Sequence, residues 1–382
     1  MLFSTALLTF ASLVLAAPSN PKVVTFPVTK HHRNSTFVQH HLHTRQIPES
    51  LVNHQAFYSL ALSLGTPAQE FNLLLDTGSS DLWVYDVKDT TDCVNDQCSY
   101  TGQYDSAGSS TYNFLNNNYF IQYVSGNAYG SWVTDTLSIG DVTLDNFQFA
   151  TVTKAGGDTG IVGISIQGQE SLAKGQGQYP NFPIALKNAG YIDRIVYSLY
   201  LDSGSATTGT LLLGGIDTAK FDGSLVYLPL ADSDGMDVQY NSISFNGQQI
   251  SGGNVATLDS GTSLTYLPDG AFQALAKQLN LADQDDQGLY SIDCDADFTL
   301  EFDFGGVTIS ASSSNLIVTD GEDQCALGVL STDQSQGYVL FGDTFLRNAY
   351  VVYDIEDSVI GIAQAKYTSA SNIQPVTGPL GN

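Results

Sequence analysis

A short apolar segment that ends in Asp, a hydroxyl residue and Gly occurs twice in this chain of 382 residues. The first copy reads LLLDTGSS at residues 73–80, and the second reads ATLDSGTS at residues 256–263. Each copy is followed 80–90 residues later by two large apolar residues and a glycine, at residues 161–163 and 340–342. Such a repeat strongly restricts the fold, because both halves must form the same local structure. We expect two versions of one lobe, each contributing one Asp from a turn at the end of a strand.

The repeated turns suit a pair of cooperating carboxylates, Asp76 and Asp259. Glycine allows the backbone to turn sharply after each Asp, and the neighbouring hydroxyls can hold the carboxylates by hydrogen bonds. Two carboxylates that face each other cannot both ionise cheaply, so the pair shares a proton at acidic pH. One member can then take a proton from water while the other supports a carbonyl oxygen. The pattern therefore favours acid–base hydrolysis over two ordinary surface turns.

The rest of the sequence predicts an all-β fold. From about residue 56, short alternating or apolar runs are separated by Gly, Asn, Asp and Ser; examples are residues 71–75, 209–213, 226–230 and 350–353. Only residues 182–189 and 269–280 look helical. Many short strands with little helix indicate sandwich or barrel architecture. We expect two β-barrel-like lobes with an active-site cleft between them.

Charge in this chain is sparse and one-sided. The chain carries 39 Asp and Glu against 13 Lys and Arg, a formal net charge of -26. Such a surplus disfavours binding to nucleic acid, which needs clustered basic residues, and docking on anionic membranes. Residues 1–45 contain no acid and four of the 13 bases, so the remainder has 39 acids, nine bases and a formal charge of -30. This balance suits a protein that works in an acidic environment, because protonated carboxylates would leave it only a modest net charge and little self-repulsion.

The N-terminal region is predicted to be removed in two steps. Residues 1–16 have the apolar run and the small-residue cleavage site of a signal peptide. The apolar run is too short for a membrane anchor. We therefore expect a secreted product, either extracellular or vacuolar. Residues 17–45 form a basic stretch with five histidines and the glycosylation sequon at Asn34. We interpret this stretch as an inhibitory propeptide rather than a disordered linker. It is expected to lie over the acidic cleft, with one cation near the Asp pair, until acidification weakens the attraction and the chain is cut after Arg45.

Cysteine and histidine positions argue against other kinds of site. The four cysteines allow three pairings, and local closure favours Cys93–Cys98 and Cys294–Cys325. Two distant cysteine pairs without a nearby histidine make a poor zinc site, so neither a metal nor another cofactor is expected. No histidine follows His54, which disfavours Ser or Cys hydrolases with a His base and His-based metallohydrolases. Glycosidases also use two carboxylates, but their chemistry does not call for duplicated Asp-Thr/Ser-Gly turns.

Several segments resemble pepsin-like aspartic endopeptidases. They are residues 64–71, 76–83, 259–263, 341–347 and 350–354, and the resemblance extends from Phe57 to about Tyr367. Residues 214–217 and 365–370 look most similar to secreted and yapsin-type fungal members. The family fold implies a bilobal molecule. We place its N-terminal lobe at residues 46–228, its C-terminal lobe at residues 229–371 and a loose tail at residues 372–382.

The resemblance also implies roles for the residues of the two turns. Asp76 and Asp259 correspond to the catalytic pair. Thr77 and Ser260 correspond to the inner hydroxyls that tie the two loops together. The hydroxyls that bond the outer carboxylate oxygens correspond to Ser79 and Thr262.

A hairpin flap is implied by the same resemblance. Tyr123 matches the tyrosine that closes over substrate, and Trp83 would brace it. The family usually has Gly after this tyrosine, whereas Val124 stands here and predicts a bulkier, stiffer flap. Residues expected to contact substrate are Gly78, Tyr123, Ser125, Gly261, Leu74 and Ile161.

The predicted activity is hydrolysis of peptide bonds in proteins at acidic pH by a monomeric enzyme. An extended peptide would bind in the cleft, with large apolar or aromatic side chains around the cut. Relatives that accept Lys tend to carry Asp where Ser125 stands, so basic specificity is less expected. Inhibitors of the pepstatin type are expected to bind. The alternative is a catalytically silent binding protein with the same fold, but both Asp residues and both adjacent glycines are intact.

Overall fold

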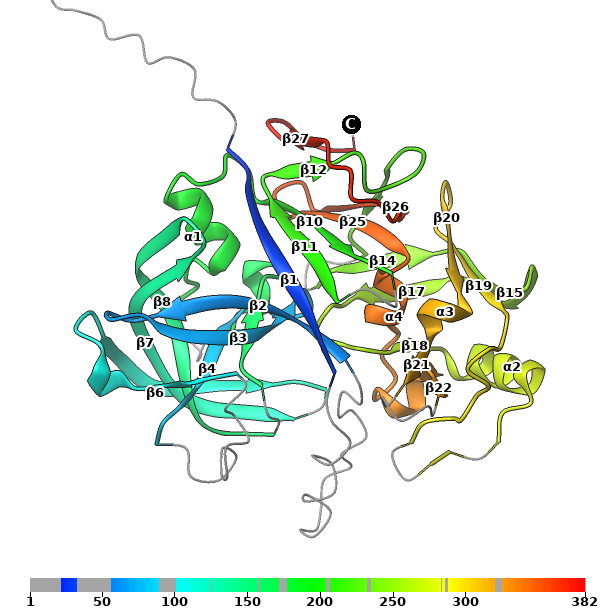
Figure 1. Cartoon of the computed structure of the whole chain (residues 1–382), viewed down its shortest axis with the longest axis horizontal. Coiled ribbons are helices and arrows are strands. Elements are labelled where there is room, and N and C mark those ends of the chain that lie inside the picture. Colours follow the sequence, from blue (N-terminus) through cyan, green and yellow to red (C-terminus); the bar gives the residue numbers. More distant parts are fainter. Residues whose placement is uncertain are drawn as a thin grey trace, which may run out of the picture.

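The structure is a computed structural model that describes residues 22–32, 56–88, 101–124, 126–156, 159–171, 177–203, 207–231, 235–282, 284–285, 288–319 and 325–381. Predicted features outside the described residues are the signal peptide, Asn34, Arg45, Cys93, Cys98 and Ser125. Figure 1 shows two groups of strands side by side, with the helices α1 and α2 at opposite ends of the molecule. The predicted all-β architecture is therefore confirmed.

The first lobe is built on one curved sheet. Its strands, in sheet order, are β2 (Ala56–Leu64), β3 (Gln69–Asp76), β9 (Ile161–Gly163), β4 (Leu82–Asp86), β8 (Val142–Ala155), β7 (Asn127–Ile139) and β6 (Asn113–Gln122), with β5 (Gln103–Tyr104) beside β4. The end of β2 also pairs with β7, with Leu64 opposite Leu137, so the sheet bends back on itself. Large side chains such as Phe71 and Phe149 fill the interior.

The second lobe contains two sheets and a hairpin. One sheet has the order β14 (Asp237–Tyr240), β17 (Asn254–Leu258), β24 (Leu340–Phe341), β18 (Thr265–Leu267) and β23 (Val329–Ser331). The other has the order β16 (Gln248–Ser251), β15 (Ser242–Phe245), β19 (Thr299–Asp303) and β20 (Thr308–Ser312). The hairpin consists of β21 (Ile317–Thr319) and β22 (Cys325–Leu327). Rings of Phe302, Phe341 and Phe345 pack together between these elements.

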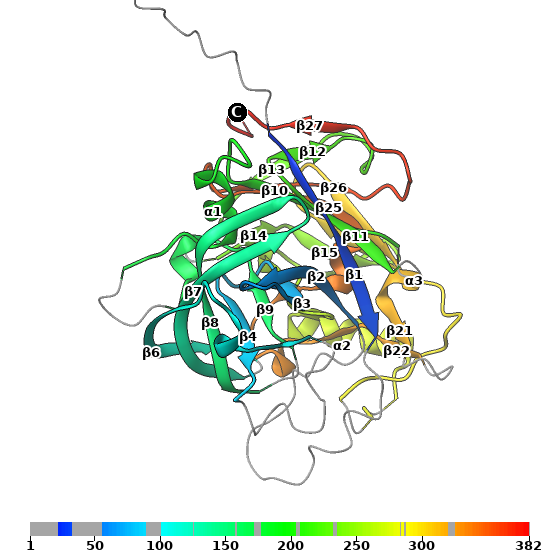
Figure 2. The same ribbon diagram turned by 60° about the vertical axis from the view of Figure 1, so that its left-hand side comes forward.

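The sheet of the first lobe continues into a layer that joins the two lobes. Its order is β13 (Val226–Pro229), β26 (Val359–Gln364), β25 (Ala349–Asp354), β10 (Val196–Leu201), β11 (Thr208–Leu213) and β1 (Val24–His32), followed by β2. Strands that precede the second lobe in the chain (β1, β10, β11 and β13) and strands that follow it (β25 and β26) lie in one layer, as Figure 2 shows. The chain therefore returns to this layer after it has formed the second lobe, and the layer connects the two lobes.

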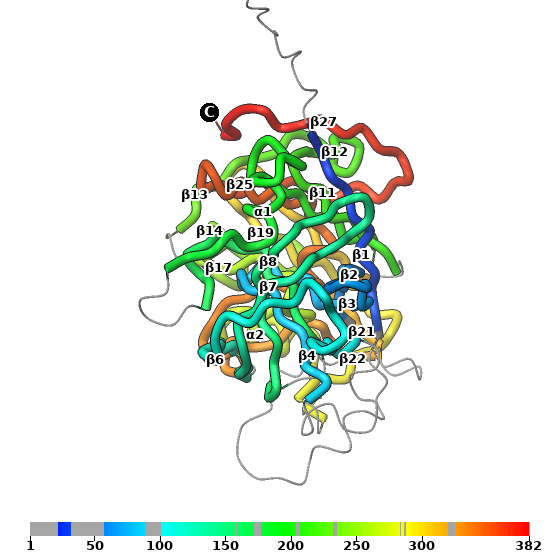
Figure 3. Tube along the Cα trace, turned by 90° about the vertical axis from the view of Figure 1, so that its left-hand side faces the viewer, coloured from blue at the N-terminus to red at the C-terminus, as the bar shows by residue number. Residues whose placement is uncertain are grey.

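Strand β1 belongs to the predicted propeptide. It lies between β2 and β11, with Val28 opposite Leu60 on one side and opposite Gly209 on the other (Figure 3). Phe26, Val28 and Lys30 point inward and are buried. This part of the leader was expected over the Asp pair; it instead forms a strand of the joining layer, because alternating apolar residues favour strand pairing. Residues 33–45 of the leader lie outside the described residues.

The repeated motif folds the same way twice, as predicted. In the first lobe, β3 runs parallel to β9 with Leu74 opposite Ile161, and β4 pairs antiparallel with the other side of β9. In the second lobe, β17 runs parallel to β24, and β18 pairs antiparallel with β24. A Cβ added to Gly163 would lie 2.7 Å from a backbone oxygen of the turn that follows Asp76. A Cβ added to Gly342 would lie 2.3 Å from a backbone oxygen of the turn that follows Asp259. This close approach explains the glycine that ends each apolar-apolar-Gly signature.

Both predicted helices are present, as α1 (Phe182–Asn188) and α2 (Asp269–Leu279). The prediction that only these segments are helical is wrong, since the described residues also form two short helices, α3 (Ser313–Leu316) and α4 (Asp343–Leu346). The predicted disulfide between Cys294 and Cys325 is also present. The prediction of a loose tail is wrong: β27 (Ile373–Pro375) pairs with β12 (Gly215–Asp217), and the following Val376 is buried. Across the described ranges, no helix is long and apolar enough to cross a membrane.

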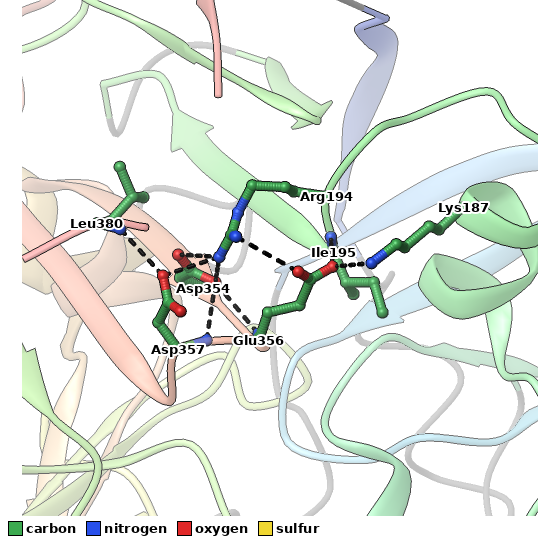
Figure 4. Close-up of polar contacts among 7 residues, drawn as sticks. All are labelled: Lys187, Arg194, Ile195, Asp354, Glu356, Asp357 and Leu380. Atoms are coloured by element: carbon green, nitrogen blue, oxygen red, sulfur yellow. Dashed lines mark hydrogen bonds and ion pairs between the residues drawn. The ribbon is translucent and has the colours of Figure 1, made fainter. Parts of the chain in front are cut away.

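A cluster of charged side chains connects the first lobe to the joining layer by ion pairs and hydrogen bonds (Figure 4). Arg194 precedes β10 and faces three acids at the turn between β25 and β26. Its Nη2 lies 2.8 Å from Asp357 Oδ2 and 3.3 Å from Asp354 Oδ1, and its Nη1 lies 3.4 Å from Glu356 Oε2. Lys187 of α1 also pairs with Glu356. The cluster therefore links α1, β10 and the β25–β26 turn.

Candidate active site

The two Asp turns meet where the lobes adjoin. Asp76 ends β3 and is buried, and Asp259 directly follows β17 and is half-buried. Each inner carboxylate oxygen accepts a backbone hydrogen bond two residues on: Gly78 N donates to Asp76 Oδ1 at 2.8 Å, and Gly261 N donates to Asp259 Oδ1 at 2.9 Å. The two carboxylates therefore have matching backbone support.

Hydroxyls hold the outer carboxylate oxygens. Ser79 Oγ donates to Asp76 Oδ2, and Thr262 Oγ1 donates to Asp259 Oδ2 at 2.5 Å. These are the contacts that the resemblance implied for Ser79 and Thr262. Because each oxygen has a donor from its own turn, both carboxylates are fixed in orientation.

A symmetric set of hydrogen bonds joins the two turns. Thr77 N donates to Ser260 Oγ at 3.2 Å, and Ser260 N donates to Thr77 Oγ1 at 2.9 Å. Each hydroxyl in turn donates across the interface, Thr77 Oγ1 to Leu258 O at 2.9 Å and Ser260 Oγ to Leu75 O at 2.8 Å. Both hydroxyls are fully buried, so these bonds do not compete with water. The geometry matches the tying role implied for Thr77 and Ser260.

The glycines of the two turns let the carboxylates approach each other. A Cβ at Gly78 would lie 2.6 Å from Asp259 Oδ1, and a Cβ at Gly261 would lie 2.5 Å from Asp76 Oδ1. Both distances are far below van der Waals contact, so no side chain fits at either position. Each carboxylate therefore lies against the backbone of the opposite turn.

The surroundings of Asp76 favour its protonated form. Burial is the largest cause, and the neighbouring charge of Asp259 adds to it, so the pKa of Asp76 is raised above its usual range. Hydrogen bonds from Ser79 and Gly78 oppose this shift without cancelling it. The pair can therefore hold one proton between its two carboxylates under acidic conditions, with the proton belonging to the pair rather than to one residue.

The predicted flap is the hairpin of β6 and β7, whose turn brings Tyr123 toward the Asp pair. Tyr123 Oη accepts a hydrogen bond from Trp83 Nε1 at 2.9 Å, as expected for the brace. Burial, followed by the charges of Asp76 and Asp81, raises the pKa of Tyr123. Its hydroxyl therefore stays neutral and can donate or accept a hydrogen bond beside the carboxylates.

The two predicted pocket walls are neighbours in the structure. Leu74 and Ile161 are opposite each other in the β3–β9 ladder, and both belong to an apolar cluster with Trp83 against which Tyr123 packs. Their contact with a substrate stays a prediction. Ser125 lies outside the described residues.

Sequence reasoning missed a buried acidic group behind the first turn. Asp81 is fully buried; its Oδ1 accepts a bond from Tyr179 Oη at 2.8 Å and its Oδ2 one from Ser171 N at 2.9 Å. Tyr179 N also donates to Glu170 Oε2 at 3.0 Å. Burial raises the pKa of Asp81 to about 6 and that of Glu170 to about 8. Only the position of Asp81 beside the first motif was a signal, since Tyr179 is 98 residues away.

Among the residues that the structure describes, no group of three or more His, Cys, Asp and Glu could hold a metal ion.

Comparison with known proteins identifies the family. The family model described as eukaryotic aspartyl protease matches residues 57–365. The chain is 35% identical over 373 residues to Candidapepsin-3 of Candida albicans, covering 92% of each chain. It is 36% identical over 391 residues to Candidapepsin-1 of Candida albicans, covering 97% of this chain and 98% of the relative. An aspartic proteinase from Irpex lacteus has the same fold, with a TM-score of 0.71 at 22% identity over 91% of this chain and 99% of the other. The chain thus belongs to the eukaryotic aspartyl proteases and is an aspartic-type endopeptidase.

Proposed function

We propose that Asp76 and Asp259 together activate a water molecule for hydrolysis of peptide bonds at acidic pH. The observation that carries this proposal is the reciprocal packing of the turns, in which each carboxylate lies against the glycine of the other. Each of the four carboxylate oxygens accepts a hydrogen bond from its own turn, so both carboxylates are held in fixed orientations beside each other. Such an arrangement places an acid and a base within reach of one water.

The reaction needs no covalent bond to the enzyme. The ionised carboxylate takes a proton from water as the water oxygen bonds to the peptide carbonyl carbon, and the protonated carboxyl gives its proton to the carbonyl oxygen. A neutral tetrahedral diol results. Its C–N bond then breaks as the nitrogen takes the proton gained from water and one diol hydroxyl returns its proton to the other carboxylate. The products are an acid and an amine, and the pair again holds one proton.

The substrate would be an extended peptide held under the β6–β7 hairpin. Leu74, Ile161 and Tyr123 supply an apolar wall near Asp76, which supports a preference for large apolar or aromatic residues at the cut. Cleavage of a peptide library, with and without a pepstatin-type inhibitor, tests this preference. Cuts mainly beside charged residues would contradict it.

Secretion and activation form the second part of the proposal. The relatives named secreted aspartic protease 3 and secreted aspartic protease 1 support export of this chain as well. We expect residues 17–45 to act as an inhibitory propeptide, released by acidification and cleavage after Arg45. N-terminal sequencing of the exported enzyme tests the boundary; a mature start upstream of Lys30 would exclude it.

The variant Asp76→Asn tests the catalytic pair. It keeps the shape of the side chain but removes the ionisable group, so cleavage of an acid-incubated protein should fall on the order of 10³-fold or more. Asp145→Asn, at an exposed position on β8, is the matched control and should cleave normally. Unchanged cleavage by Asp76→Asn would exclude this mechanism. A wild-type protein that binds peptides but cleaves none would instead favour the silent binding protein.

A further inference from the structure

A single side chain connects the tip of the β6–β7 hairpin to the opposite lobe. Gln336, which lies in the second lobe between β23 and β24, donates from Nε2 to the backbone oxygen of Val124 at 2.7 Å. Val124 directly follows Tyr123 in the turn of the hairpin. The two bonded residues are 212 positions apart in the chain. The bond therefore bridges the two lobes on the side of the molecule where the Asp turns meet.

The backbone around Gln336 is held in an uncommon conformation. Gln336 has a φ of 54°, in the left-handed region that residues other than Gly, Asn and Asp seldom adopt. The adjoining bonds fix it: Gly337 N donates to Thr332 O at 2.8 Å, and Tyr338 N donates to Ser335 O at 3.0 Å. Ser335 is fully buried and its hydroxyl bonds to Thr332 O at 3.2 Å. A non-glycine residue kept in this region by its surroundings points to a functional use.

The loop that carries Gln336 is attached to the support of Asp259. Immediately after the loop, Val339 O accepts a hydrogen bond from Thr257 N, and β24 then pairs with β17, which leads into Asp259. At the other end of the bond, Tyr123 N donates to Gly126 O at 2.7 Å, and Tyr123 Oη is held by Trp83. Gln336 thus joins the hairpin that carries Tyr123 to the strand pair that carries the second Asp.

We infer that Gln336 is a positioning residue that holds the hairpin closed over the Asp pair, an inference that rests on the proposed peptide hydrolysis. The carbonyl of Val124 has a donor from the opposite lobe only when the hairpin is closed. Closure brings Tyr123 beside Asp76 and surrounds a bound peptide. If only the closed form binds peptide well, the apparent dissociation constant is the intrinsic constant divided by the closed population, so a smaller closed population weakens binding. Gln336 therefore acts on substrate binding rather than on the chemical step.

The variants Gln336→Ala and Gln336→Asn remove the bond in two ways. Alanine removes the amide, whereas asparagine keeps the amide and favours the left-handed backbone, but its side chain is one carbon shorter. One hydrogen bond shifts the equilibrium between the closed and open hairpin by roughly three- to tenfold. In both variants, the rise in KM for a short peptide multiplied by the acceleration of hydrogen exchange in residues 119–124 and 126–130 should equal this factor, because the closed population that is lost from binding becomes the open population that exchanges. The value of kcat should stay within about twofold, and exchange elsewhere should not change. Gln248→Ala, an exposed glutamine on β16, is the control and should behave as wild type.

The variant Gln336→Glu makes the bond depend on pH. A protonated carboxyl can donate to Val124 O at pH 3, but a carboxylate at pH 6 cannot, because an exposed Glu titrates near pH 4.3. Hairpin exchange should therefore match wild type at pH 3 and match Gln336→Ala at pH 6, each compared at the same pH. Wild-type exchange together with wild-type KM in all three variants would overturn the inference, as would a fall in kcat with exchange and KM unchanged. Exchange does not require catalysis, so a failure of the proposed function is distinguishable from a failure of this bond.

Discussion

Two glycines set how closely the carboxylates approach. Gly78 and Gly261 each occupy a position where a methyl group would lie about 2.5 Å from the opposite carboxylate. The requirement at these positions is space rather than turn geometry, since neither glycine has a positive φ. Substitution there should therefore affect the relation between the two Asp residues more than the fold of either turn.

Gly78→Ala is expected to separate the carboxylates while leaving the lobes folded. The added Cβ would meet Asp259 Oδ1 at 2.6 Å, so one turn must shift by a substantial fraction of an ångström. Because small misplacements of reacting groups are costly, kcat/KM should fall by about 10²-fold. Gly270→Ala is a matched control, since no atom lies within 4 Å of its Cβ and the position is near the start of α2. Normal cleavage by Gly78→Ala would show that the turns tolerate separation.

The contacts of the turns were predictable at this scale, but the acids behind them were not. The order Asp, hydroxyl, Gly, hydroxyl was enough to anticipate that hydroxyls within each turn hold its carboxylate, as Ser79 and Thr262 do, because a short turn allows few partners. The bonds of Thr77 and Ser260 join residues more than 180 positions apart, and only the family resemblance implied them. The bond between Tyr179 and Asp81 depends on how a long intervening stretch folds. No local pattern identifies such a partner. The same reason hid the contact between Gln336 and Val124.

Among the elements, the turn between β25 and β26 depends on Arg194. The guanidinium is 13% exposed, and its partner Asp354 is fully buried. Hydrogen bonds and the cations Arg194 and Lys187 lower the pKa of Glu356 against the opposing effect of burial. The pKa of Asp357 is also lowered against the effect of burial, by the hydrogen bond from Leu380 N and by the charge of Arg194. This cluster therefore contributes most above the usual pKa of a carboxylate.

Arg194→Met should destabilise the protein because it leaves a buried carboxylate without its cation. We expect a loss of roughly 2–4 kcal/mol near pH 6, from the cost of breaking a largely buried pair. Glu356 and Asp357 have lowered pKa values in the folded state, so their contribution disappears as the pH falls through those values and the loss should shrink by pH 2.5. Urea unfolding at both pH values measures the effect. Lys366→Met, which breaks an exposed pair with Asp222, should cost under about 1 kcal/mol; equal losses would contradict the explanation.

Elements were predictable where their own residues carried the pattern. The helices at 182–189 and 269–280 have apolar spacing that is complete within each segment. Strand β1 also had a signal, the apolar alternation through Val24, Phe26 and Val28, but the basic composition of the leader favoured an inhibitory segment over the acidic cleft. Strand β27 is too short and too polar for any such signal, and it exists because β12 offers it a partner.

At the scale of the whole molecule, acidic conditions favour the protonated form of several buried carboxyls. Asp81 and Glu170 lie together around Tyr179, near Asp76, Tyr119 and Tyr123. Their raised pKa values mean that the folded chain binds more protons than the unfolded chain between about pH 4 and pH 8. Folding stability must then fall as the pH rises through this range.

Neutral variants of these acids should flatten that decline. Asp81→Asn should remove the part between about pH 4 and pH 6, which for this buried group amounts to about 3 kcal/mol. Glu170→Gln should act between about pH 4 and pH 8, and its amide can still accept from Tyr179 N. Urea unfolding midpoints from pH 4 to pH 8 give the measurement, with Asp145→Asn as the exposed control. A decline as steep as that of wild type in both variants would assign the loss to other groups.

Strand β24 has a consequence for the cell that makes this enzyme. A chain is synthesised from its N-terminus, and β24 follows β17 only after a long intervening stretch. Until residues 340–341 emerge from the ribosome, β17, which leads into Asp259, lacks its parallel neighbour. We expect that nascent and truncated chains without β24 are therefore inert. The order of the elements along the chain thus delays proteolysis until β24 has been made, whatever the leader adds afterwards.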